Sequence, residues 1–142
     1  EKMLITNDRF VRTTDPNHRN IVYQFYERVN QSGDIYIGNQ TGWYCVGCEE
    51  FKEVAKSEKE PCCSIHKKRL EWRDEQNLFF KLSKYQSFIE DLVETEDFIQ
   101  PSIRKNEISN FVKKGLKDFS ISRVNVDWGI PVPGLEGHTF YV

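Results

Sequence analysis

The sequence predicts a mixed α/β fold, an α+β arrangement of antiparallel strands and helices. Segments in which apolar and polar residues alternate predict strands, and three segments with apolar residues at helical spacing predict helices. Cysteines and a histidine cluster between the predicted strands, which indicates a metal site, a disulfide or a redox pair. A chain of 142 residues with 38% hydrophobic residues suits one domain, alone or within a longer protein.

The composition indicates an ordinary water-exposed surface. With 30% charged residues and a net charge of −2, the chain resembles neither a disordered nor a strongly basic nucleic-acid-binding protein. No apolar run approaches the roughly 18–20 residues that cross a bilayer, and "EKMLITNDRF" lacks the apolar core of a signal peptide. We therefore expect an intracellular chain without membrane contact, where a structural disulfide is disfavoured. Both ends look like cuts, which predicts a fragment.

The first element pair is a strand in "RFVRTT" followed by a helix. Asp15 suits the N-cap and Pro16 the first helical position, where its missing N–H costs nothing. Gly33 supplies a left-handed stop. The apolar residues at helical spacing, which we expect to pack on an apolar surface, are Ile21, Val22, Phe25 and Val29.

The next segment, "DIYIGNQTGWYC", predicts a β-hairpin with its turn at Gly38 and Asn39. A charged surface excursion with a weak helical pattern follows, between Cys48 and Cys63. One or two further strands are expected in "RLEWRDEQNLFFKLS".

Two helices and a strand-and-loop segment complete the chain. One helix is capped at Ser83, and the other begins near Ser102 and stops at Gly115. Helix is forbidden in "GIPVPG" by Pro131 and Pro133. The residues expected to face inward are Tyr85, Ile89 and Leu92 in the first helix and Ile108, Phe111 and Val112 in the second.

The cysteine spacing favours a metal. Cys45 and Cys48 form a C-x2-C pair, and Cys63 and His66 form a C-x2-H pair. This spacing lets each turn direct two side chains at one point, and Gly47 would permit a positive φ there. Three thiolates and one imidazole complete a tetrahedral shell without an open position, which predicts structural Zn²⁺.

Other interpretations of the same residues remain open. The cysteines could be ordinary reduced thiols, or a thioredoxin-like redox pair, although no βαβ context surrounds them. Cys62 could replace Cys63 as a ligand, but only Cys63 has the x2 relation to His66. We therefore expect Cys62 to be a non-ligand.

Several strings resemble one known family. "FVRTTD", "GDIYIGNQTGWYCVGCEEF", "NLFFKLSKYQ", "LKDFSISR" and "WGIPVPG" with "FYV" resemble, in this order and spacing, the middle of methionyl-tRNA synthetases, which are class I aminoacyl-tRNA synthetases. One string alone would be unspecific, but five in order are specific. The resemblance covers nearly the whole chain and is nearest to the bacterial and organellar-like branch with one zinc knuckle.

The resemblance implies a domain division. Residues 1–15 would end the first half of a Rossmann-type catalytic domain, and residues 16–118 would form the inserted connective-peptide domain with the zinc knuckle. Residues 119–142 would begin the second half of the catalytic domain.

The resemblance also implies an activity. Such enzymes condense methionine with ATP to methionyl-adenylate and pass the methionyl group to the terminal adenosine of tRNA. Methionine, ATP, Mg²⁺, tRNA and the rest of the synthetase polypeptide are therefore the expected partners, in the cytoplasm or an organelle. The HIGH-type and KMSKS-type motifs of the family do not occur in this sequence, so we expect this chain alone to be inactive.

The resemblance assigns a catalytic role to Arg123 in "SISR", because it matches an arginine at the edge of the family's active site. Without the resemblance, a surface arginine at a strand end would be preferred. Trp128 could line a substrate pocket, although packing is the more ordinary role. His18 and His138 have no partner pattern and are expected at the surface.

The remaining charged and aromatic residues receive mostly structural interpretations. Two basic clusters could contact tRNA phosphates or simply be solvated; they are Lys67, Lys68 and Arg69, and Lys113, Lys114 and Lys117. The aromatic residues Tyr36, Trp43, Tyr44, Phe79 and Phe80 are expected in the core rather than as base-stacking platforms. The acidic residues Asp34, Glu49, Glu50 and Glu53 are expected to face solvent.

Two other functions compete with the synthetase. A free-standing zinc-ribbon module that binds RNA or protein would not need "SISR" and "WGIPVPG". A related synthetase for another apolar amino acid would carry a larger insertion with an editing site. The synthetase for methionine remains the leading hypothesis.

Overall fold

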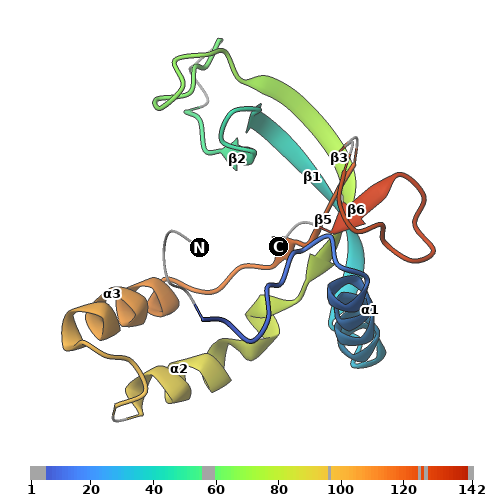
Figure 1. The fold of residues 1–142 in the computed structure, drawn as a ribbon. Coiled ribbons are helices and arrows are strands. Elements are labelled where there is room, and N and C mark those ends of the chain that lie inside the picture. The colour runs from blue at the N-terminus through green and yellow to red at the C-terminus, as the bar shows by residue number, and fades with distance from the viewer. Residues whose placement is uncertain (1–5, 56–59, 96, 125, 127, 141–142) are drawn as a thin grey trace.

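The computed structural model describes residues 6–55, 60–95, 97–124, 126 and 128–140. Within these ranges it contains a four-stranded antiparallel sheet in the order β2-β1-β3-β4, and a separate pair formed by β5 and β6. Helices gather at one end of the long β1–β3 ribbon, and the loops that hold the cysteines lie at the other (Figure 1). The predicted mixed α+β class is confirmed.

The β1–β3 ribbon is the central element. β1 (Ile35–Cys45) pairs with β3 (Glu71–Phe80) along its length, from Ile35 opposite Phe80 to Tyr44 opposite Glu71. The predicted hairpin turn inside β1 is therefore wrong, because the strand runs straight through it. The backbone at the predicted turn finds its partners more than thirty residues further along the chain, where Gly38 lies opposite Asn77 and Asn39 opposite Gln76.

Gly38 has a packing role instead of a turn role. It lies opposite Asn77 in the ladder, and Asn39 lies opposite Gln76. A Cβ on residue 38 would come within 3.0 Å of the Phe79 ring and 3.1 Å of the Tyr36 ring. The glycine makes room for these two stacked rings, whose centroids are 5.6 Å apart.

The first helix, α1 (Pro16–Gln31), has the predicted ends. Asp15 is its N-cap residue and Gly33 follows its C-cap with a φ of +73°. Its Tyr23 and Tyr26 rings lie 6.4 and 5.0 Å from the Phe140 ring.

The apolar side of α1 is only partly covered in this chain. Ile21 and Phe25 are 63% and 70% exposed, whereas Val22 and Val29 are half-buried. The strand predicted at residues 9–14 does not form, since these residues take part in no ladder of the described chain.

A helical hairpin forms the second half of the helical end. The 3₁₀ turn η1 (Leu82–Tyr85) leads into α2 (Gln86–Glu94), and α3 (Ser102–Lys113) follows. Gln86 joins the two helices, since its side chain donates to the Val112 carbonyl and accepts from the Leu116 N–H. The buried residues of this hairpin are Val93, Val112 and Leu116, with Leu82, Ile89 and Ile99 packed around them.

Two details of the hairpin differ from expectation. Ser83 lies within η1 rather than at a helix cap, and its N–H and hydroxyl both donate to Asp118. Ile108 and Phe111 are 42% and 62% exposed, so Val112 alone of the three predicted α3 residues is buried. The two helices bury only the residues along their line of mutual contact and leave their other apolar residues exposed.

The C-terminal segment crosses back to the ribbon. β4 (Phe119–Ser120) pairs with the end of β3, and the Ile121 N–H then donates to the Leu78 carbonyl. β5 (Ser122–Val124) pairs with β6 (His138–Phe140). The last two residues of the predicted terminal strand lie outside the described ranges.

The buried core is divided rather than continuous. One small cluster lies around the cysteines and another lies in the helical hairpin, at opposite ends of the ribbon. None of the described helices has the length and apolarity needed to cross a membrane.

Candidate metal centre

Two turns of the same geometry carry the predicted ligands. In one, the Glu49 N–H donates to the Cys45 carbonyl at 2.8 Å, and in the other the Lys67 N–H donates to the Cys63 carbonyl at 2.8 Å. Glu49 and Lys67 have φ values of 57° and 54°, so each turn closes through a left-handed residue just after its second ligand. The sequence suggested a positive φ at Gly47, but the left-handed residue of this turn is Glu49.

Gly47 is needed for a different reason. A Cβ on this residue would lie 2.9 Å from both Cγ and Cδ2 of His66, closer than real Cβ contacts. The absent side chain lets the imidazole of the second turn approach the backbone of the first. This contact joins the two turns and points the histidine at the cysteines.

The four predicted side chains converge. His66 Nδ1 lies 3.3 Å from Cys48 Sγ, 3.7 Å from Cys63 Sγ and 3.8 Å from Cys45 Sγ. Cys48 Sγ and Cys63 Sγ are 3.6 Å apart, and the four ligand atoms lie within 4.8 Å of one another. Tetrahedral zinc with bonds of about 2.3 Å to sulfur requires sulfur atoms about 3.8 Å apart. The donor set therefore fits a metal ion of this size.

The surroundings of the cluster contain little apolar support. Cys45 and Cys63 are each 2% exposed and pack with buried Leu70, and Trp43 and Val54 are half-buried against them. The segment after Cys48 forms the short strand β2 (Glu50–Lys52) against the end of β1. The weak helical pattern noted there does not form a helix in residues 49–55.

Neighbouring groups shift the pKa values of two of the thiols. The His66 N–H donates to Cys63 Sγ at 3.4 Å and, with the imidazole, lowers the pKa of Cys63 to about 6. Burial, followed by the neighbouring thiols, raises the pKa of Cys48 to about 11. Thiolate ligands held this close repel one another, and a bound cation would offset that repulsion.

Cys62 lies apart from this cluster. It is exposed, and its Sγ is 3.9 Å from the Glu60 carbonyl oxygen. Its backbone forms an isolated bridge with Arg69, whose guanidinium pairs with Glu60. The structure thus brings together the four side chains that the spacing grouped and leaves Cys62 outside.

Arg123 occupies a separate site. Only 9% of Arg123 is exposed, and its Nη1 donates to Ser120 Oγ at 2.6 Å and to the Ser122 carbonyl at 2.9 Å. Ser122 is hydrogen-bonded to the Leu78 N–H, near the end of β3 that is remote from the cysteines. Without the family resemblance, the preferred interpretation is a surface arginine. That interpretation is wrong, because the side chain is buried.

A polar centre that sequence reasoning missed lies around Asp34. The prediction that Asp34 faces solvent is wrong, because it is 1% exposed. Its carboxylate accepts from Lys84 Nζ at 2.5 Å, Tyr85 Oη at 2.5 Å and Ser32 Oγ at 2.7 Å. These hydrogen bonds, led by that from Lys84, hold the pKa of Asp34 well below its usual range. No local pattern signals a partner fifty residues away.

Two other single-residue expectations differ from the structure. Trp128 is 76% exposed and does not pack within the described chain. His138 is half-buried rather than at the surface, and its Nδ1 lies 3.2 Å from Ser122 Oγ. The pairing of β5 with β6 brings the side chains of Ser122 and His138 together.

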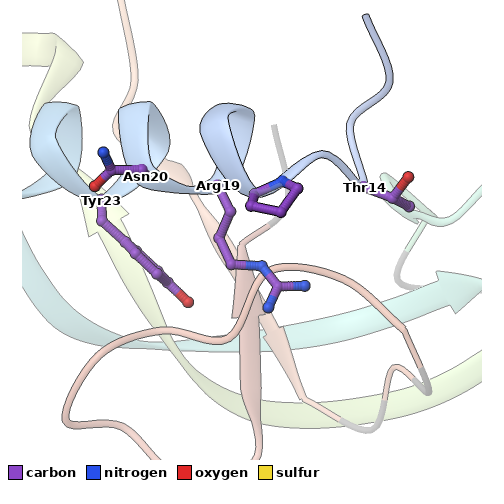
Figure 2. A pocket seen from close by; sticks show the side chains of 5 residues that line it. Thr14, Arg19, Asn20 and Tyr23 are labelled. Atoms are coloured by element: carbon purple, nitrogen blue, oxygen red, sulfur yellow. The ribbon is translucent and has the colours of Figure 1, made fainter.

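A cavity of about 340 Å³ lies at the start of α1 (Figure 2). Arg19 and Tyr23 extend from the helix toward the same side, where Figure 2 shows them below the ribbon. The lining residues are Thr14, Pro16, Arg19, Asn20 and Tyr23. These side chains include no carboxylate, thiol or imidazole.

Comparison with known proteins gives consistent matches. A family described as "tRNA synthetases class I (M)" matches residues 1–56 and 52–142. The chain is 57% identical over 140 residues to a methionine–tRNA ligase of a Nostoc species, covering 97% of this chain and 26% of that protein. It is 50% identical to the chloroplastic/mitochondrial methionine–tRNA ligase of Arabidopsis thaliana, covering 97% of this chain and 23% of that one.

The fold is similar to solved structures. The crystal structure of Mycobacterium tuberculosis methionyl-tRNA synthetase bound by methionyl-adenylate matches with a TM-score of 0.80 and 37% identity. The match covers 97% of this chain and 28% of that structure. This chain therefore spans about a quarter of the length of the relatives that it matches.

Proposed function

The chain belongs to the class I tRNA synthetase family of the methionine type, and from this membership we propose that it is part of a methionine–tRNA ligase. The complete ligase would join the methionine carboxylate to the α-phosphate of ATP, releasing pyrophosphate. It would then transfer the methionyl group to the terminal adenosine of tRNA, releasing AMP. The observation that carries this proposal is the 57% identity over nearly the whole chain to such a ligase.

Within that enzyme, this chain would supply the zinc-stabilised insertion. Zn²⁺ would be held by three thiolates and by Nδ1 of the imidazole; the ligands are Cys45, Cys48, Cys63 and His66. The convergence of four donors supports a closed shell, which makes the metal structural rather than catalytic. Residues 1–15 and 119–142 would belong to the catalytic domain, and residues 16–118 to the insertion.

The zinc would replace a hydrophobic core at this end of the molecule. Among the described residues, the buried apolar cluster at this end consists of two of the ligands, Cys45 and Cys63, and of Leu70, which is little apolar packing for two turns and a loop. Because metal-binding free energy becomes local folding free energy, the ion would keep the end of the ribbon in one conformation.

Arg123 is the residue of this chain that we assign to the reaction. A buried guanidinium held at a fixed position is suited to stabilise negative charge that develops during adenylate formation. ATP and Mg²⁺ would be bound mainly by parts of the ligase outside this chain. This agrees with the absence of the two ATP signature strings from the sequence.

The cellular setting follows the relatives only broadly. They include bacterial enzymes and a chloroplastic/mitochondrial enzyme. We therefore propose a site in the cytoplasm or in an organelle, with methionine, ATP and tRNA as partners.

The test is methionine-dependent ATP–pyrophosphate exchange by the complete polypeptide, followed by charging of tRNA. Activity with methionine and little with leucine, isoleucine or valine is expected. The present chain alone should show no exchange. A complete polypeptide that activates another amino acid in preference to methionine would overturn the proposal.

A further inference from the structure

Arg123 is a charged residue in a nearly closed environment. It is 9% exposed, and the adjacent Ser122 is fully buried. Burying a guanidinium is costly unless its N–H groups are hydrogen-bonded. The acceptors that surround it therefore decide both its stability and its orientation.

The Nη1 group of Arg123 meets two acceptors. Ser120 Oγ lies 2.6 Å from it and the Ser122 carbonyl oxygen lies 2.9 Å from it. Both hydrogens of Nη1 lie in the plane of the rigid guanidinium. Two acceptors for one nitrogen therefore fix the direction of the whole plane, in addition to the position of the nitrogen.

Ser120 is itself held in one orientation. Its Oγ also donates to the Ser122 carbonyl at 2.9 Å, so its only hydroxyl hydrogen is used there and a lone pair faces Arg123. Ser120 is 9% exposed and lies opposite Phe79 in the ladder of β3 and β4. Ser122 is fixed in turn by the Leu78 N–H, which donates to its Oγ at 2.9 Å.

We propose that Ser120 is a positioning residue that sets the guanidinium plane of Arg123 for adenylate formation. This rests on the proposed function of Arg123. The hydroxyl of Ser120 is an acceptor that links Arg123 to β4, and β4 is paired with β3. The position of β3 therefore helps to set the orientation of the guanidinium plane. Removing the hydroxyl would take away one of the two acceptors that define the direction of the Nη1 hydrogens, and with it the contact that ties the plane to β4.

The test is a double-substitution cycle in the complete ligase, using Ser120→Ala, Arg123→Lys and the two together. We expect Ser120→Ala to lower kcat for ATP–pyrophosphate exchange about tenfold, the value of a hydrogen bond to a charged group, with a smaller change in KM. In the Arg123→Lys background the same change should have little further effect, because the plane that it positions is gone.

Additional variants separate positioning from folding. Ser120→Thr keeps the hydroxyl and should retain most of kcat, whereas Ser120→Cys replaces the hydroxyl with a somewhat larger group that is a weak acceptor and should behave like alanine. The control is Ser83→Ala, which also removes a short serine hydrogen bond, the 2.6 Å bond to Asp118. Its effect should combine with that of Arg123→Lys by simple multiplication.

The outcomes distinguish the two proposals. Effects of Ser120→Ala and Arg123→Lys that multiply would overturn the positioning role, as would full activity of Ser120→Cys. Full activity of Arg123→Lys and Arg123→Ala would instead refute the role of Arg123 itself. In that case the methionine-dependent activity of the parent enzyme would still stand.

Discussion

Gly47 and His66 are in direct contact across the two turns of the candidate metal centre. A Cβ on residue 47 would come within 2.9 Å of the imidazole carbons Cγ and Cδ2. The contact places Nδ1 of the ring 3.3 to 3.8 Å from three cysteine sulfurs. The glycine therefore sets the position of a ligand from the opposite turn, a role that the spacing of the cysteines does not reveal.

Gly47→Ala should weaken zinc binding. The added methyl group would displace the His66 ring, and misplacing a ligand through its supporting contact typically lowers metal affinity about 10- to 100-fold. Competition against a chromophoric chelator would measure the change. The control is Gly42→Ala, whose Cβ would meet only a Phe51 ring carbon at 3.4 Å. Equal affinities for the two variants would contradict this account.

The metal content should distinguish Cys63 from Cys62. We expect about one zinc per chain in the parent and in Cys62→Ser, because Cys62 lies outside the cluster. Cys63→Ser should lose most of the zinc, since it removes one of four converging ligands. Mass spectrometry of freshly reduced protein provides the measurement. Absence of metal from the parent would refute the zinc assignment.

Removing the metal should disorder one end of the molecule and leave the other folded. Trp43 packs against the cluster and its ring lies 5.3 Å from that of Trp72, so chelation should change tryptophan fluorescence. The helical hairpin has its own buried cluster at the opposite end of the ribbon. Far-ultraviolet circular dichroism should therefore retain its helical signal. Loss of both signals together would show one cooperative unit instead.

Asp34→Asn should destabilise the fold in a pH-dependent way. The folded-state pKa of Asp34 is lowered from 3.8, so its contribution is complete above about pH 4. It is lost progressively as the pH falls from there toward the lowered pKa. The difference in free energy of unfolding between parent and variant should therefore be largest near neutral pH and shrink in acid.

Asp91→Asn is the matched control for this measurement. Asp91 is exposed on α2, and this substitution should change stability little at any pH. Urea titrations at several pH values would provide the comparison. A parent-to-variant difference for Asp34 that grows in acid would mean that the sign is wrong.

Val112→Ala should lower the free energy of unfolding more than Phe111→Ala does, although phenylalanine is the larger residue. Val112 is 3% exposed within the helical hairpin, so its truncation should cost about 1–3 kcal/mol. Phe111 is 62% exposed in this chain, and its truncation should change stability by less than about 0.5 kcal/mol. Urea unfolding of the isolated chain would decide between them.

Sequence reasoning succeeded where the signal was local. The start of α1 after Asp15, its end before Gly33 and the stop of α3 at Gly115 depend on residues within one turn of the helix end. The x2 spacing of the cysteine turns is equally local, and the structure brings those four side chains together. The family resemblance likewise came from short strings, and the comparison with relatives confirms it.

Local patterns were insufficient where a distant partner decided the outcome. Gly38 and Asn39 are suited to a turn, yet the whole of β3 was available to pair with this segment, and a continuous ladder satisfies more backbone groups. Helical spacing on α1 and α3 indicated apolar sides without showing how much of each would be covered.

The sequence by itself determined both ends of α1, the stop of α3, the two cysteine-containing turns and the family, because each is encoded by residues close together in the chain. Only the tertiary structure decided that Asp34 would meet Lys84, that Gly47 would admit His66, and that Ser120 would hold Arg123. The physical reason is common to these contacts. Buried charges and close approaches are defined by what the fold brings beside them, and folding selects those neighbours through pairing and burial over the whole chain.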